Sequence, residues 1–146
     1  MIYNIIFFAL KKSHLKSIVN VIDEQKIEEN KKSRDKTIIL VGFGGGFRRT
    51  ELISIDHEDL EFVPEGLKIS IRRSKTDQFG EGMIKGLPYF TNENYCPVAN
   101  LKNWLQISKI KSGPIFRRFS KGSTLTENRL TCLLYTSDAA DEEDSV

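Results

Sequence analysis

Two cationic side chains in this 146-residue chain have the type and setting that phosphate chemistry requires. Arg48 follows three consecutive glycines, 44–46, and opens an expected short helix, Arg48 to Ile55. A guanidinium is planar and permanently charged, so it can donate to two non-bridging oxygens of one phosphate. Lys75 lies at the polar tip of an expected hairpin, where a long stem carries a mobile, titratable ammonium. Taken alone, each is an ordinary surface charge, and Arg48 would then form an ion pair with Glu51.

The neighbours of these two residues suit the same chemistry. Glu51 lies one helical turn after Arg48, so its carboxylate can orient Arg48 or accept hydrogen bonds from nearby amides. Lys75 is flanked by groups that can contact phosphate or sugar. These flanking binding candidates are Arg72, Arg73, Ser74 and Thr76.

Other candidate sites are better explained as structure. The glycine run lacks the Gly-Lys-Ser/Thr ending of a phosphate-binding loop, which favours a tight turn over a nucleotide site. His14 and His57 are isolated from each other and lie in no Cys/His ligand pattern, so we expect no metal. Trp104 falls on the apolar face of an expected helix and is predicted to be core.

Helices are expected in the first third of the chain. Apolar residues recur at three- and four-residue spacing between Ser13 and Ile22, which predicts an amphipathic helix with Ser13 as N-cap. The polar stretch from Asp23 to Ser33 is expected to be a solvated helix end and loop. The apolar stretch from Arg34 to Phe43 is either a buried helix or a central strand, because periodicity alone does not decide between them.

Alternating apolar residues then predict a small antiparallel sheet. A Pro64-Glu65-Gly66 turn joins the first two strands, and residues 82–87 supply a third after the polar tip at 74–80. Pro97 begins another amphipathic helix that reaches about Ser108, a short buried connector follows at 115–116, and 125–130 is expected to start a further helix. The predicted fold class is α+β, with helices around a three-stranded antiparallel sheet.

Composition and charge describe a globular chain with a basic body. Hydrophobic residues make up 39% and charged residues 29%, which excludes wholesale disorder, collagen and a coiled coil. The formal charge of +2 includes five acidic residues in 132–146; without that segment, 22 basic and 15 acidic residues leave a net charge of +7. This excess favours a polyanionic partner. Two cysteines and no signal or membrane-spanning pattern lead us to expect a cytoplasmic protein.

Several segments resemble the tyrosine recombinase, or phage integrase, catalytic domain. Residues 46–52, GFRRTEL, are similar to the G-L-R-x-S-E-L box of that family, and 55–60, IDHEDL, to the segment leading to its first strand. Residues 73–77, RSKTD, place Lys75 where the family has its catalytic lysine. Residues 96–105, CPVANLKNWL, and 113–117, GPIFR, look like the CPV-helix and GP-L-F segments of integrases.

The resemblance divides the chain into three parts. Residues 11–131 would be part of the catalytic domain, and residues 1–10 a linker remnant. Residues 132–142, CLLYTSDAADE, resemble a translated transposase-end sequencing adapter, so we expect 132–146 to be an artefactual tail. Tyr135 is therefore not taken as a nucleophile. A native acidic tail is the alternative.

By this resemblance the intact parent would be a site-specific recombinase that breaks and rejoins double-stranded DNA through a phosphotyrosine, without metal or nucleotide, as a tetramer on paired sites. Arg48 would stabilise the pentacoordinate phosphate, Lys75 would protonate the departing 5′-hydroxyl, and Glu51 would support Arg48. The family's H-x-x-R box and its nucleophilic tyrosine find no match in the chain, so these residues alone are expected to be inactive. A non-enzymatic DNA-binding regulatory module and a basic domain that binds no DNA are the alternatives.

Overall fold

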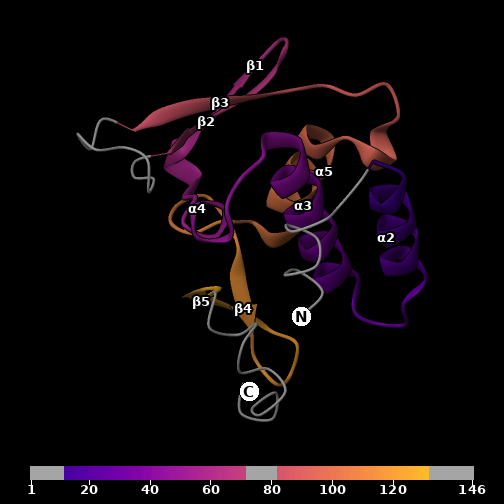
Figure 1. Ribbon diagram of the computed structural model, residues 1–146. Helices are drawn as coiled ribbons and strands as arrows, with labels where there is room; N and C mark the ends of the chain where they lie inside the picture. The colour runs from indigo at the N-terminus through magenta and orange to yellow at the C-terminus, as the bar shows by residue number, and fades with distance from the viewer. Residues whose placement is uncertain (1–11, 72–81, 132–146) are drawn as a thin grey trace.

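The chain forms helices that pack beneath a small antiparallel sheet, as the computed structural model describes it for residues 12–71 and 82–131 (Figure 1). The helices and strands, in chain order, are α2 (Lys12–Glu24), α3 (Glu29–Gly45), α4 (Arg49–Ile53), η1 (His57–Asp59), β1 (Leu60–Val63), β2 (Gly66–Ile71), β3 (Met83–Pro88), η2 (Glu93–Tyr95), α5 (Pro97–Ser108), β4 (Arg117–Phe119) and β5 (Leu125–Arg129). The α+β class and the three-stranded antiparallel sheet are confirmed.

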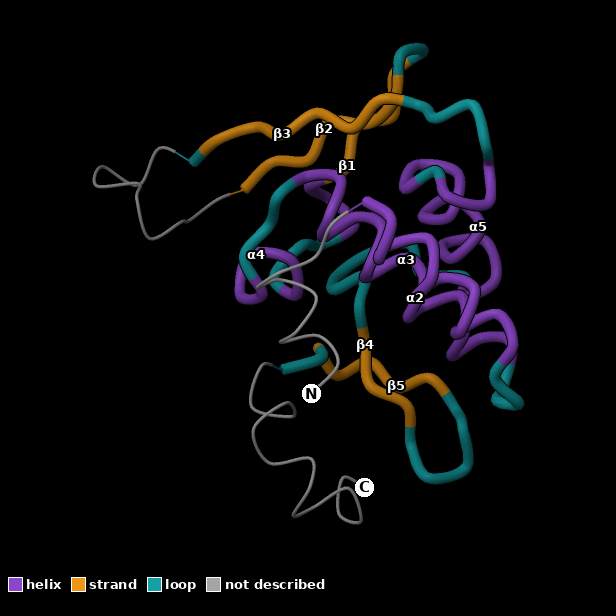
Figure 2. The backbone as a smooth tube through the Cα atoms, turned by 45° about the vertical axis from the view of Figure 1, so that its right-hand side comes forward, coloured by secondary structure: helices purple, strands orange, loops and turns teal. Residues whose placement is uncertain are grey.

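Helix α3 is the centre of the molecule. It packs against α2 on one side and α5 on the other, as Figure 2 shows for the helix layer. Six consecutive residues, 37–42, are buried, because neighbours cover the helix all round. The Thr37 hydroxyl lies within hydrogen-bonding distance of the Ser33 carbonyl at 2.7 Å and the Asn100 carbonyl at 3.1 Å, so this buried polar group is satisfied.

The sheet has the order β1-β2-β3, with antiparallel neighbours. Leu67, Ile69 and Ile71 of β2 are buried while Lys68 and Ser70 are exposed, as the alternation predicted. Gly66 pairs with Pro88, and a Cβ at Gly66 would lie only 2.0 Å from the Leu87 carbonyl oxygen. Ile71 pairs with Met83, so the end of β2 lies beside the start of β3.

Helix α5 and the connector after it close the main core. Trp104 is fully buried, as predicted, and its Nε1 donates to the Ile115 carbonyl at 2.7 Å. The connector residues Ile115 and Phe116 are also fully buried, which confirms that expectation.

No helix within residues 12–71 and 82–131 combines the length and the apolar character needed to cross a bilayer.

Three local expectations were wrong. Residues 125–129 form strand β5, paired antiparallel with β4, instead of starting a helix. The turn at Gly122 and Ser123, which has a φ of 63°, returns the chain so that Leu125 lies opposite Phe119 on the edge of the core. The loop predicted for 23–33 is shorter, because α3 already begins at Glu29, and Ser13 lies within α2 instead of capping it.

Candidate functional site

The turn between α3 and α4 carries Arg48. Helix α3 ends at Gly46, which is left-handed with φ 63° and ψ 37°, a conformation that a glycine adopts without strain. The amide of the next residue, Phe47, donates to the Gly42 carbonyl at 3.1 Å. The turn predicted for the glycine run is confirmed at Gly46 alone, because Gly44 and Gly45 still belong to α3.

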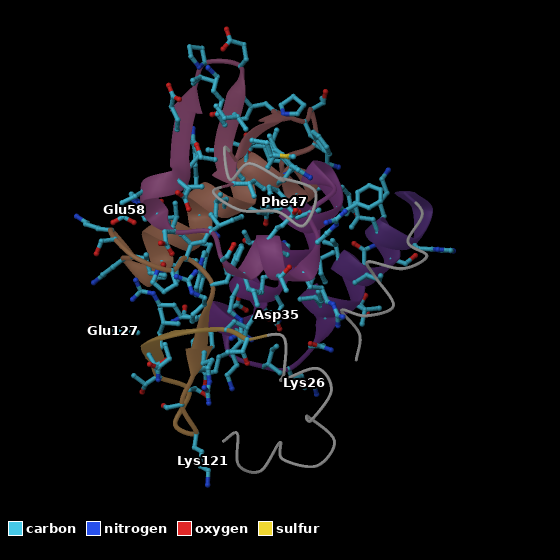
Figure 3. All side chains as sticks on the ribbon, turned by 60° about the vertical axis from the view of Figure 1, so that its left-hand side comes forward. Lys26, Asp35, Phe47, Glu58, Lys121 and Glu127 are labelled. Atoms are coloured by element: carbon cyan, nitrogen blue, oxygen red, sulfur yellow. The ribbon has the colours of Figure 1, made fainter. Side chains whose placement is uncertain are left out.

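Phe47 anchors this turn in the core. Its side chain is buried, and its ring folds back over Gly45, where an added Cβ would lie 2.3 Å from a ring carbon. The ammonium of Lys85, on β3, lies 4.8 Å from the ring centroid. Figure 3 shows Phe47 well inside the molecule, away from Lys121 at the β4–β5 turn.

Glu51 fixes the main chain of Arg48. Its Oε1 accepts from the Arg48 backbone amide at 2.9 Å, while the Arg48 carbonyl accepts from the Leu52 amide at 2.9 Å. Glu51 is only 7% exposed. Glu51 therefore caps the amide of Arg48.

The Arg48 side chain itself is exposed. Among the residues that the structure describes, it has no ion-pair partner, and the surface pair with Glu51 considered from sequence does not form. An exposed guanidinium on a main chain held at both its amide and its carbonyl is suited to an anionic ligand from outside.

A second arginine, Arg129, lies at the opposite end of α4. Its Nη1 donates to the Ile53 carbonyl at 3.0 Å, and its Nη2 pairs with Asp56 Oδ1 at 2.8 Å. Sequence reasoning missed this contact, because residue 129 was placed in a helix instead of a strand that returns to α4.

A hollow of about 410 Å³ lies between α4, the end of β2 and Arg129. It brings Glu51 of α4 and residues of the segment that follows this helix, 54–59, near Ser70 and Ile71, the last two described residues before position 72. Its lining carries three carboxylates, those of Glu51, Asp56 and Asp59, and one guanidinium, so the hollow itself disfavours a phosphate.

The remaining predicted site residues, Arg72, Arg73, Ser74, Lys75 and Thr76, lie outside the described residues. Within the described ranges, no group of three or more His, Cys, Asp or Glu side chains is arranged to hold a metal ion. Among the described residues, the candidate site consists of the α3–α4 turn and its supports.

Comparison with known proteins relates the chain to recombinases. The chain is 40% identical over 114 residues to an integrase/recombinase XerD homolog of Selenomonas ruminantium, covering 78% of this chain and 33% of that protein. The chain is homologous to the tyrosine recombinases. No protein-family model matches it.

A solved recombinase has the same partial fold. The XerH site-specific recombinase, crystallised with its difH substrate in a pre-cleavage complex, superposes with a TM-score of 0.55 at 20% identity. The match covers 84% of this chain and 32% of XerH. The chain thus spans about a third of the length of the recombinases it matches.

Proposed function

We propose that residues 11–131 are part of the catalytic domain of a tyrosine site-specific recombinase, and that the α3–α4 turn binds a backbone phosphate of double-stranded DNA. The observation that carries this is the Arg48 guanidinium, exposed and without an ion-pair partner among the described residues, on a main chain fixed by Glu51. Homology to a XerD homolog at 40% identity and the basic charge of the body support the same reading.

In the proposed reaction, a tyrosine oxygen attacks phosphorus and the bond to the 5′-oxygen breaks. Arg48 would stabilise the added negative charge on the pentacoordinate phosphate, an effect that is largest in the transition state. Lys75 would donate a proton to the departing 5′-oxygen as general acid. Arg72, Arg73, Ser74 and Thr76 would hold the adjacent phosphates and sugars.

The intact recombinase would supply the nucleophile and assemble as a tetramer on paired sites. No His in these 146 residues is followed three positions later by Arg, since Ser17 follows His14 and Leu60 follows His57. We therefore propose that these residues alone bind DNA without cleaving it. A nicked suicide substrate checks this: the expected result is no covalent adduct on a denaturing gel, and an adduct to this chain would overturn the proposal of inactivity.

DNA binding is tested by fluorescence anisotropy with a nonspecific duplex over a range of salt concentrations. Affinity should fall as salt rises, because neutralised phosphates release counterions. Arg48→Gln should weaken binding by roughly tenfold near 0.1 M salt and reduce the salt slope by about one, as the loss of one phosphate contact does.

Arg118→Gln on β4 is the matched control, since it removes the same charge from another element. Its expected loss of affinity is smaller than that of Arg48→Gln. Equal losses for the two variants would contradict the role of Arg48. Absence of salt-dependent binding by the unsubstituted chain would contradict the proposal as a whole and favour a basic domain that binds no DNA.

A further inference from the structure

We propose that Lys85 is a positioning residue that holds the α3–α4 turn and so presents Arg48 to the phosphate. This inference rests on the proposed function and adds to it a residue outside the segments that resemble the recombinases. It starts from an interaction between segments far apart in the sequence: Lys85 Nζ donates to the Gly45 and Gly46 carbonyls, each at 3.0 Å. We call Lys85, Gly45, Gly46 and Phe47 the Lys85 clamp.

The C-terminal end of helix α3 has no basic residue of its own. The C-terminus of a helix carries partial negative charge on carbonyls without helical partners, and basic residues of the last turn usually offset it. Lys85 supplies the missing charge from β3, across the interface between α3 and the sheet.

The aromatic ring fixes the geometry of the clamp. The ammonium sits 4.8 Å from the centroid of the Phe47 ring, and that ring covers Gly45 so closely that a Cβ there would overlap it. Cation, ring and carbonyls therefore support one another within a single cluster. Arg48 is the next residue, so any movement of the cluster moves its backbone.

The clamp also connects the two parts of the proposed site. Lys85 pairs with Ile69 and shares its inward face, while Met83, two residues earlier, pairs with Ile71 at the point where β2 and β3 leave the described sheet. Lys75 belongs to the sequence between those two residues. Lys85 thus links β3, the strand that follows Lys75 in the sequence, to the turn that carries Arg48.

Two readouts test the role of Lys85. In Lys85→Met, which keeps an apolar stem of similar length, amide hydrogen exchange at Phe47 should be roughly five- to tenfold faster, because a helix-terminal charge and its hydrogen bonds are lost. Affinity for the nonspecific duplex should fall several-fold, and Lys85→Arg should restore most of both. The matched control is Lys68→Met, since Lys68 is exposed on the neighbouring strand and faces the other side of the sheet.

Combining substitutions separates positioning from direct contact with phosphate. If Lys85 acts through Arg48, then Lys85→Met should weaken binding little further in the Arg48→Gln background. Additive losses, with a second reduction of the salt slope, would mean that Lys85 contacts phosphate itself and would overturn the inference.

The outcome also distinguishes this inference from the proposed function. If Arg48→Gln weakens DNA binding but Lys85→Met behaves like Lys68→Met in both readouts, the clamp is wrong while the proposed function stands. If the unsubstituted chain shows no salt-dependent binding, the proposed function fails and the presentation of Arg48 to phosphate fails with it. Faster exchange at Phe47 would then leave Lys85 with a structural role alone.

Discussion

The two ends of helix α4 carry arginines that use the same functional group differently. Arg129 donates to the Ile53 carbonyl at the C-terminal end and pairs with Asp56, so its guanidinium is committed to the fold. Arg48, at the N-terminal end, is held only through its backbone, and its side chain remains exposed. The contrast teaches that a cation available to a ligand is recognised by a fixed main chain and an uncommitted side chain. Residue type does not distinguish the two arginines.

Removing the anchor of the N-terminal end should have the largest effect. Phe47→Ala should lower the free energy of unfolding by about 3–5 kcal/mol, because a buried ring leaves a cavity beneath the turn. Urea unfolding followed by circular dichroism measures this. Phe43→Ala, at a half-exposed position of α3, is the control and should cost about 1 kcal/mol or less. Equal costs would mean that Phe47 does not anchor the turn.

A smaller change at the same end is Gly45→Ala. The new methyl group would overlap the Phe47 ring, so the ring must shift and stability should fall by about 1–3 kcal/mol. Gly122→Ala is the matched control, because a Cβ at Gly122 meets nothing within 4 Å. Thermal melts compare the two, and an unchanged melting temperature for Gly45→Ala would show that the turn is looser than described.

At the C-terminal end, Arg129→Met should lower the free energy of unfolding by about 1 kcal/mol. The value is modest because the Arg129 side chain is 37% exposed and its pair with Asp56 is screened by water. The salt slope of DNA binding should stay unchanged, which is the reverse of the result expected for Arg48→Gln. A slope reduced by Arg129→Met would erase the difference between the two ends.

The smallest effect is expected for Glu51→Gln, which keeps an acceptor for the Arg48 amide but removes the charge. The cost should be about 0.3–1 kcal/mol, the usual contribution of an anion near helix N-terminal amides. Equilibrium unfolding at low and high salt measures it, and the difference should shrink as salt rises. A much larger cost would show that the Glu51 carboxylate also holds a cation.

The sheet was predictable from sequence, whereas α3 was ambiguous, for a physical reason. One face of β2 is buried and the other is exposed to solvent. Apolar and polar residues therefore alternate from Leu67 to Ile71, which indicates a strand. Residues 37–42 of α3 are covered all round by other elements, so their continuous apolar run carries no period. The strand at 125–129 was missed because it pairs with β4 across a turn. The five residues of the strand do not themselves specify that turn.

The candidate site was predictable only in part. The spacing of Arg48 and Glu51 on one helical turn was enough to predict a contact between them, which the structure gives as a hydrogen bond to the amide. Lys85 was not predictable, since a lysine in a strand ordinarily points to water and its carbonyl partners lie 39 and 40 positions earlier. Long-range contacts of this kind are set by packing that local sequence does not record.

The close approach of Gly66 to the Leu87 carbonyl oxygen limits which changes of length the β2–β3 pair tolerates. A side chain at that position would collide with the Leu87 carbonyl, so a slip of β2 against β3 is blocked sterically as well as by the loss of apolar burial. Ile71 and Met83 therefore remain facing partners regardless of the number of residues that joins them. Insertions and deletions between Ile71 and Met83 can therefore be accommodated while the sheet, the clamp and Arg48 stay in place.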